Sequence, residues 1–277
     1  MQATEIEPFA PLASPMTPAL DSPFLNLQGV SYTYPGWPPV VQGVDWRLAR
    51  GAFHCLVGRS GCGKTTLLKL AAGLLQPDSG GVLLDGQAVT QPSPVAGFVF
   101  QSPTLLDWLT IWDNVLLPAQ LRGKASGKLS GHDGQKVRDK AASLLEAMGL
   151  SAYAQQYPHQ LSGGHQSRVA IARALVLDPA VLLMDEPFAA LDAITREELQ
   201  LELLNLCRRQ NSTVMFVTHD ITEAVFLADR VAVMDRGVMT RDVPIDLPRP
   251  RTSAMRYSAE FNQLCAQLRA AMDAGAP

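Results

Sequence analysis

Two stretches near the start of the chain, 24–34 and 44–48, alternate irregularly between apolar and polar residues. Alternation of this kind predicts antiparallel strands with one buried face, and the proline-containing segment 35–39 between them predicts a turn. A short, largely apolar segment at 53–57 then predicts a buried strand. It leads into a glycine-rich loop and into a helix predicted at 65–75.

The middle of the chain, from 101 to about 175, changes to a helical period. Five apolar residues lie on one face of a helix that Gly149 is expected to end: Val137, Ala141, Leu144, Leu145 and Met148. The segment before that helix, 122–135, is rich in Gly, Ser and Lys and predicts a surface loop.

Strands and helices alternate again beyond residue 180. The pattern predicts strands at 181–184 and 214–217 and helices at 197–210 and 224–228. Such alternation is typical of a parallel sheet whose strands are joined by helices. We therefore expect an α/β fold with a parallel sheet, N-terminal antiparallel strands and a helical lobe inserted at about 102–175.

The two ends of the chain differ from the part between them. Residues 1–23 contain five prolines among Ala, Ser and Thr and show neither the helical nor the strand period, so we expect a disordered leader there. One folded domain is then expected at 24–251. A helical tail is expected at 252–277, with its helix at 259–272.

Composition narrows the class of protein. Hydrophobic residues make up 47% and charged residues 18% of the 277 residues, which is typical of a globular chain. No apolar run approaches the ~18 to 20 residues that cross a bilayer, and the longest, at 95–100 and 214–217, predict buried strands. The acidic residues of the leader account for the net charge of −3, and the balanced remainder argues against nucleic acid as a partner. The four cysteines show no paired spacing, which argues against zinc and against a disulfide framework.

The glycine-rich loop at 58–65 reads GRSGCGKT, the pattern of a phosphate-binding loop (P-loop). Backbone N–H groups at a helix N-terminus form an anion site, and glycines let the chain curl around phosphates. In this pattern Lys64 reaches the β- and γ-phosphates of ATP, and the Thr65 hydroxyl binds Mg²⁺. The core is therefore expected to be a P-loop NTPase. The predicted nucleotide contacts in this segment are Gly58, Arg59, Ser60, Gly61, Cys62, Gly63, Lys64, Thr65 and Thr66.

Two neighbouring carboxylates, Asp185 and Glu186, end the apolar strand predicted at 181–184, and Pro187 prevents that strand from continuing. Adjacent carboxylates repel each other, so their position at a strand end indicates a cation nearby. We infer that Asp185 holds Mg²⁺ through water. Glu186 then serves as the base, or orients the water that attacks ATP.

A second glycine motif, LSGG at 161–164, indicates the class of ATPase. Together with the P-loop and the sequence MDEP at 184–187, it resembles the ATP-binding subunit of an ABC transporter. The resemblance covers about 24–251. It implies that the chain hydrolyses ATP with Mg²⁺ and that this hydrolysis drives transport across a membrane.

Three further positions fit that family's pattern. The resemblance places Tyr34 against adenine, Gln101 near Mg²⁺ and the γ-phosphate, and His219 on the γ-phosphate. The implied catalytic residues are Lys64, Gln101, Glu186 and His219, and the implied metal ligands are Thr65, Gln101 and Asp185.

The LSGG segment has a different part in the resemblance. Ser162, Gly163 and Gly164 would begin a helix whose N-terminus points at the γ-phosphate held by another subunit. Asp192 would contact that partner's P-loop across the same interface. The implied assembly is therefore a homodimer around two ATP molecules.

The signature departs from the family at two positions. The family usually continues LSGGQ with another Gln before the Arg, whereas this chain has His165 and Ser167 there. Both residues are expected on the helix beyond the phosphate-contacting turn. We therefore expect the chemistry to survive, with His165 a tolerated surface substitution or, alternatively, a pH sensor.

The segment 100–110 is the most informative about the subtype. It resembles the nitrate, sulfonate, taurine and bicarbonate importer group, which implies an integral-membrane permease, a second copy of the chain and an external substrate-binding protein. The chain would then be peripheral on the cytoplasmic face of the cell membrane. Leu106 and Trp108 belong to an apolar cluster near Gln101, which predicts either a docking site for a permease helix or core of the helical lobe.

Other classes of function remain as alternatives. An exporter subunit fits the ATPase motifs but not the importer-like segment 100–110. A soluble ABC ATPase without a transport role would be favoured by long coiled-coil insertions or tandem domains, and the sequence has neither. A GTPase or P-loop kinase has no use for LSGG, and the guanine motif Asn-Lys-x-Asp does not occur.

Overall fold

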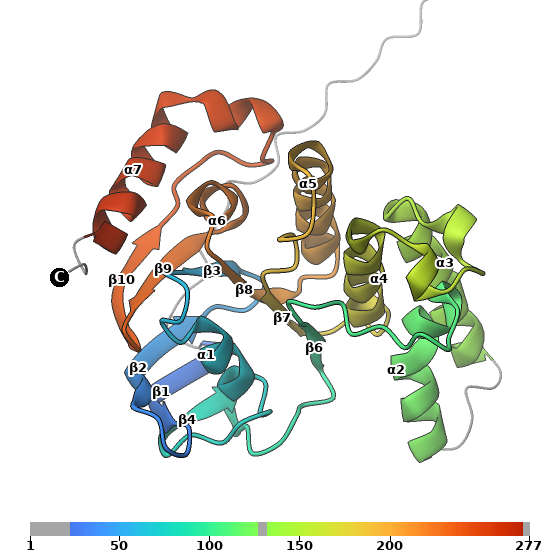
Figure 1. Cartoon of the computed structure of the whole chain (residues 1–277), viewed down its shortest axis with the longest axis horizontal. Coiled ribbons are helices and arrows are strands. Elements are labelled where there is room, and N and C mark those ends of the chain that lie inside the picture. The colour runs from blue at the N-terminus through green and yellow to red at the C-terminus, as the bar shows by residue number, and fades with distance from the viewer. Residues whose placement is uncertain (1–22, 127–131, 274–277) are drawn as a thin grey trace, which may run out of the picture.

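The computed structural model describes residues 23–126 and 132–273, which form two sheets and a set of helices (Figure 1). The leader predicted at 1–23 lies outside the described residues except for its last one. The middle of the loop predicted at 122–135 also lies outside them.

The larger sheet has six strands in the order β10-β9-β3-β8-β7-β6. Its strands from β9 to β6 run parallel, and β10 pairs antiparallel with β9. The predicted parallel sheet is therefore confirmed, and β9 and β10 are additional to the predicted strands. The strands are β3 (Phe53–Val57), β6 (Ala96–Val99), β7 (Val181–Asp185), β8 (Thr213–Thr218), β9 (Arg230–Asp235) and β10 (Val238–Pro244).

The smaller sheet is antiparallel, in the order β2-β1-β4-β5. It confirms the predicted pairing of the first two strands. The strand β4 has no clear sequence signal, because Gly80 and Gly81 at its start interrupt the apolar pattern. Its strands are β1 (Leu25–Thr33), β2 (Pro39–Leu48), β4 (Ser79–Leu84) and β5 (Gln87–Ala88).

The helical lobe consists of α2 (Ile111–Ser126), α3 (His132–Ala147) and α4 (Gly163–Leu175), with two short 3₁₀ turns, η1 (Ser151–Tyr153) and η2 (Pro158–Gln160). The prediction of a loop over 122–135 is wrong at both ends, because α2 continues to Ser126 and α3 already begins at His132. Helix α2 packs against α3 and α4, and α3 also packs against α4.

The remaining helices join or cover the strands of the larger sheet. The helix predicted at 65–75 ends early, since Gly73 adopts a φ of +73°, a left-handed conformation that stops a helix. The helices are α1 (Lys64–Ala71), α5 (Ala193–Arg209), α6 (Ile221–Leu227), the 3₁₀ turn η3 (Ser253–Tyr257) and α7 (Ala259–Asp273).

Each face of the larger sheet is covered by a different layer. Alternate residues of β3 show this: Cys55 and Val57 pack among the helices of the lobe and α5 to α7, whereas Leu56 packs against α1 and the smaller sheet. The six-stranded sheet is therefore the middle layer, with the helices of the lobe and α5 to α7 on one face and α1 with the smaller sheet on the other (Figure 1). Within the described ranges, no helix is long and apolar enough to cross a membrane.

One buried histidine on β3 makes folding sensitive to acid. Burial and the positive charge of Arg230 lower the pKa of His54 from 6.5 to about 3. The unfolded chain therefore binds more protons at this site than the folded chain, and stability is lost as the pH falls from 6.5 towards 3. We expect this group to cost about 2 kcal/mol of unfolding free energy between pH 7 and pH 5.

Urea unfolding at both pH values would measure that loss in the wild-type chain and in His54→Gln. The glutamine does not titrate, so the variant should lose correspondingly less stability at pH 5. Equal acid sensitivity of the two proteins would contradict the prediction.

Candidate functional site

The predicted site residues follow the C-terminal ends of neighbouring strands in the larger sheet. The ladder pairs Val57 of β3 with Thr218 of β8, so the P-loop and His219 start side by side. It also pairs Val99 of β6 with Met184 of β7, which places Gln101 and Glu186 each two residues beyond a paired position. Parallel strands present their carboxyl ends at one edge of a sheet, and this is where α/β folds bind ligands.

The P-loop leaves no room for side chains at two of its glycines. A Cβ on Gly58 would lie 2.3 Å from the carbonyl oxygen of Met234, and one on Gly63 would lie 2.5 Å from that of Val40. Gly63 also has a φ of +106° at the N-cap of α1. The loop can therefore curl over the start of α1 only with glycine at these positions.

Lys64 is enclosed by the loop that precedes it. The side chain is buried, and its Nζ donates hydrogen bonds to the carbonyl oxygens of Gly58 and Arg59, both at 2.9 Å. Cys62 is also buried, and burial raises the pKa of its thiol. Cys62 is thus a small side chain enclosed by the loop. Arg59 points outward and forms an exposed ion pair with Asp273, the last residue of α7.

Thr65 connects the P-loop to the carboxylates of β7. Its hydroxyl donates a hydrogen bond to Oδ1 of Asp185 at 3.1 Å. Asp185 is buried, and burial raises the pKa of its carboxyl group, while the Thr65 hydrogen bond and the positive charges of Lys64 and Lys69 act in the opposite direction. The structure thus brings a hydroxyl and a carboxylate oxygen together at the beginning of α1.

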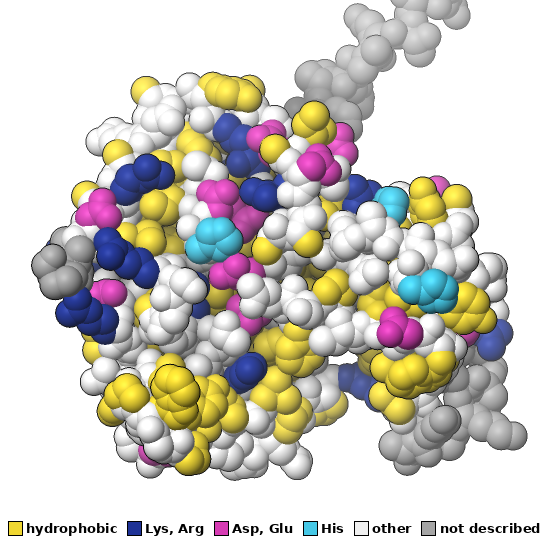
Figure 2. Space-filling model, viewed as in Figure 1, with side chains coloured by type: hydrophobic (Ala, Val, Ile, Leu, Met, Phe, Trp, Pro, Cys, Tyr) yellow, Lys and Arg dark blue, Asp and Glu magenta, His cyan; other side chains and the backbone are white. Residues whose placement is uncertain are grey.

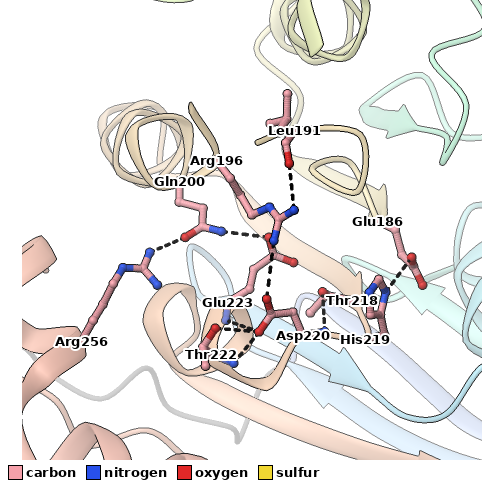
Figure 3. Close-up of polar contacts among 10 residues, drawn as sticks. All are labelled: Glu186, Leu191, Arg196, Gln200, Thr218, His219, Asp220, Thr222, Glu223 and Arg256. Atoms are coloured by element: carbon pink, nitrogen blue, oxygen red, sulfur yellow. Dashed lines mark hydrogen bonds and ion pairs between the residues drawn. The ribbon is translucent and has the colours of Figure 1, made fainter. Parts of the chain in front are cut away.

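Glu186 and His219 meet at the ends of β7 and β8. The Oε2 atom of Glu186 lies 2.9 Å from Nδ1 of His219 (Figure 3). Glu186 has a φ of +44°, a left-handed conformation that is costly for a residue with a side chain and that is found at functional sites. Its backbone N–H donates to the carbonyl oxygen of Val217 at 2.9 Å, which holds this turn against β8.

Acidic, basic and histidine side chains gather in the middle of this face of the molecule, between α6 and α1 (Figure 2). Tyr34 lies at the P-loop side, where its hydroxyl is 3.4 Å from the hydroxyl of Thr66. Its ring contacts that of Tyr32 edge to face at 4.9 Å. Gln101 is exposed just after β6.

Within one chain, the LSGG segment does not lie with the site residues of the P-loop, β7 and β8. Ser162 is the N-cap of α4, and its hydroxyl accepts a hydrogen bond from the backbone N–H of His165 at 3.3 Å. The residues of α4 pack on the opposite face of the sheet from α1. Gly163 and Gly164 begin α4, as expected from the sequence, and lie away from the P-loop of their own chain.

The two departures in the signature have separate environments. The ring of His165 packs against that of Tyr153 with 4.8 Å between centroids. Ser167 is buried, and its hydroxyl donates to the carbonyl oxygen of Gly163 at 3.1 Å. Ser167 therefore belongs to the interior of the first turns of α4.

Asp192 is the N-cap of α5. It is exposed, and its Oδ1 accepts a hydrogen bond from the backbone N–H of Thr195 at 3.0 Å. Hydrogen bonds from Thr195 lower the pKa of the Asp192 carboxyl group. The segment before this helix is tied to it, since the Arg196 guanidinium donates to the carbonyl oxygen of Leu191 at 2.8 Å.

A family model described as ABC transporter matches residues 41–189, which is more than half of the chain. The chain belongs to the ABC transporter family. The nitrate import ATP-binding protein NrtD of Synechococcus elongatus is 45% identical over 240 residues, covering 84% of this chain and 85% of that protein. The aliphatic sulfonates import ATP-binding protein SsuB of Bacillus thuringiensis is 40% identical, covering 83% of this chain and 86% of that protein.

Solved structures of ABC cassettes match as well. The dimeric post-hydrolysis state of the cassette MJ0796, bound to ADP and Pi, is 31% identical with a TM-score of 0.72, covering 81% of this chain and all of that chain. The protein cbiO1 of Clostridium perfringens, part of the cbiONQ complex, is 27% identical with a TM-score of 0.70, covering 81% of this chain and 90% of that chain. This ABC chain is thus an ATPase with the expected α/β P-loop fold, and its curated relatives include import ATP-binding proteins.

Sequence reasoning missed a polar network beside the Glu186–His219 pair. It consists of residues from α5, α6 and η3 and includes Gln200, Glu223 and Arg256 (Figure 3). The only sequence signal is a set of polar residues at otherwise apolar helix positions, and such residues are usually solvent-exposed. Gln200 and Glu223 are buried instead.

Proposed function

We propose that this ABC ATPase is the peripheral, ATP-hydrolysing subunit of an importer for a small anion such as nitrate or an organic sulfonate. The main support is that the P-loop, the Asp185–Glu186 pair and His219 follow the ends of adjacent strands β3, β7 and β8. The ATP-binding roles of the relatives support the reaction, and their cargoes, nitrate and aliphatic sulfonates, support the class of solute.

Each proposed role uses an atom that the fold holds in place. Lys64 would donate to the β- and γ-phosphates from the start of α1, and Tyr34 would stack on the base. Glu186 would accept a proton from the attacking water or orient it, and His219 at 2.9 Å would keep that carboxylate directed at the γ-phosphate. Gln101 would contact the same phosphate from the end of β6.

The residues at the P-loop fit Mg²⁺. The ion prefers oxygen ligands and takes only one or two from protein in phosphate-transfer sites, where water and phosphate supply the rest. The Thr65 hydroxyl and the Asp185 carboxylate, 3.1 Å apart, offer that donor set, and Gln101 would add a side-chain oxygen. When bound, the ion neutralises phosphate charge during transfer.

A second copy of the chain would complete the site. Ser162, Gly163 and Gly164 form a helix N-terminus, which attracts anions, yet it lies away from the P-loop of its own chain. Asp192 is exposed next to that region. A face-to-face dimer would bring both onto the partner's nucleotide, and the dimeric ADP-bound cassette with a TM-score of 0.72 supports this arrangement.

The segment 103–110 is the proposed docking site for the permease. Buried Asn114 accepts a hydrogen bond from the backbone N–H of Leu106 at 2.9 Å and donates to three carbonyl oxygens between Leu106 and Thr110. Arg173 binds the carbonyl oxygens of Pro103 and Thr104 from the other side. The loop is thereby held in one shape with Trp108 exposed by 73%, as an anchor residue of an interface would be.

Trp108→Ala should remove the permease from the ATPase. We expect at least about a tenfold loss of association, because a buried interface tryptophan is worth 2 kcal/mol or more. Quantitative co-purification from membranes measures this loss. Trp37→Ala is the control, since Trp37 is equally exposed at 71% on another part of the surface. Unchanged permease recovery with Trp108→Ala would rule out this docking site.

Affinity purification of the tagged chain from detergent-solubilised membranes tests the importer as a whole. A stoichiometric integral-membrane permease in the eluate would support it, and the accompanying substrate-binding protein can then be titrated with nitrate and with ethanesulfonate. Recovery with soluble partners alone would favour an ABC ATPase without a transport role. A permease without an associated substrate-binding protein would favour an exporter.

A further inference from the structure

The C-terminal segment 253–273 folds back onto the ATPase core. The helix α7 packs against α6, β9 and β10, and its residues Phe261 and Leu268 are buried. In η3 the side chain of Arg256 is directed inward, with 10% of it exposed. Its guanidinium lies over the ring of Phe226 in α6, 3.7 Å from the centroid.

Arg256 donates a hydrogen bond from Nη2 to Oε1 of Gln200, in the middle of α5. Gln200 is 1% exposed, and its Nε2 donates to Oε1 of Glu223 in α6 at 2.9 Å. An amide has one acceptor and one donor end, so it can satisfy a guanidinium on one side and a carboxylate on the other. Glu197 adds a further ion pair to Arg256 at 3.8 Å.

Glu223 passes these contacts on to the turn that carries His219. The backbone N–H of Glu223 donates to Oδ1 of Asp220 at 3.3 Å, and the backbone N–H of Asp220 donates to the Thr218 hydroxyl oxygen at 3.0 Å. The side chain of Asp220 caps α6 by accepting from the backbone N–H groups of Thr222 and Glu223. Thr218 and Asp220 flank His219, so both neighbours of the histidine take part in these contacts (Figure 3).

A second branch leads to the segment before Asp192. The Arg196 guanidinium lies 3.8 Å from Oδ2 of Asp220 and donates to the carbonyl oxygen of Leu191 at 2.8 Å. One network, buried at Gln200 and Glu223, thus contacts the turn at His219 and the residue next to Asp192, and Arg256 joins it to the C-terminal segment.

We propose that Arg256 is a positioning residue for ATP hydrolysis: through Gln200 and Glu223 it holds the Thr218–Asp220 turn, and so the orientation of His219 towards Glu186. Docking of the segment 253–273 therefore sets the turnover rate of the ATPase. The proposal rests on the proposed function, in which Glu186 and His219 act on ATP.

The burial of the network gives this coupling its strength. Hydrogen bonds polarise one another in a chain, and a buried carboxylate that loses a donor is strongly destabilised relative to one in water. Without Arg256, Gln200 is free to turn, and Glu223 loses its oriented donor. The Asp220 cap of α6 is then the remaining constraint on the turn at His219.

Three variants of the full chain separate positioning from simple stability. Arg256→Ala removes the first link, and Gln200→Met breaks the second while the guanidinium stays over Phe226. Arg256→Lys keeps the charge but loses the planar fork. Tyr257→Ala is the matched control, because Tyr257 is in the same 3₁₀ turn and 83% exposed.

Two measurements are made on each protein: kcat and KM for ATP, and the ring ¹⁵N chemical shifts of His219 by NMR without nucleotide. We expect about a tenfold lower kcat with little change of KM for Arg256→Ala and Gln200→Met, corresponding to the loss of one charge-assisted hydrogen bond. The kcat of Arg256→Lys should lie between that of these two variants and that of the wild type. The His219 shifts should move in the same order and stay unchanged in Tyr257→Ala.

The proposal would be overturned if folded Arg256→Ala and Gln200→Met had the same His219 ring shifts as the wild type, whatever their activity. A kcat loss that tracks only thermal stability, with unmoved His219 shifts, would overturn it too. Failure of the proposed function would give a different result, because the wild-type chain would then lack ATP turnover that depends on Glu186. The NMR shifts would still show whether Arg256 sets the orientation of His219.

Discussion

Glu186→Gln is expected to lower the ATP turnover rate by about three orders of magnitude and to leave ATP binding intact. The amide matches the carboxylate in shape and can keep a hydrogen bond to His219, where the two side chains now lie 2.9 Å apart. It cannot accept a proton from water, and it orients water poorly as an acceptor. The loss should therefore fall on kcat alone.

Single-turnover ATP hydrolysis and equilibrium ATP binding, measured on the same preparation, check both parts of this result. Because hydrolysis no longer separates the subunits, the variant should also accumulate as an ATP-bound dimer in size-exclusion chromatography. Glu198→Gln is the control for the substitution, since it makes the same change on the exposed side of α5. Near-normal turnover of Glu186→Gln would remove Glu186 from the catalytic role.

Lys64→Ala should weaken ATP binding by about a hundredfold, which corresponds to roughly 3 kcal/mol of charge-assisted hydrogen bonds to phosphate. The buried ammonium also donates to the carbonyl oxygens of Gly58 and Arg59, so its removal loosens the curl of the P-loop. We expect AMP binding to change far less, because the predicted contacts of Lys64 are to the β- and γ-phosphates.

Calorimetric titration with ATP and with AMP measures both effects. Lys136→Ala is the control, because Lys136 is an exposed lysine of α3 outside the P-loop. Lys64→Arg should recover little affinity, because a planar guanidinium does not fit the enclosed position of a compact ammonium. Equal losses for ATP and AMP would indicate damage to the fold of the loop and not a missing phosphate contact.

Most of the site follows from local rules that the sequence alone expresses. A strand that ends in glycines and Lys-Thr must continue as a loop and a helix, and Asp185 and Glu186 end a wholly apolar strand. Those rules predict the residues that meet at the sheet edge, because parallel strands place their C-terminal ends together. The structure adds the contacts: Thr65 to Asp185 and Glu186 to His219.

Predictions failed where the sequence pattern is weak and packing decides. The end of α2 and the start of α3 lie in a stretch rich in Gly, Ser and Lys that suggested a loop, yet both segments are helical. Gly80 and Gly81 obscured β4, whose strand forms because β1 is there to pair with it. Strand propensity depends on such partners more than helix propensity does.

The sequence by itself thus determined the class of fold, the P-loop between β3 and α1 and the carboxylates at the end of β7, because these depend on the local period and on short motifs. Only the tertiary structure decided which distant polar residues meet. Arg256, Gln200 and Glu223 are separated by up to 56 positions, and nothing in their spacing indicates a hydrogen-bonded chain. The physical reason is that a buried polar group must find its partner in space, and that partner is set by how the helices pack.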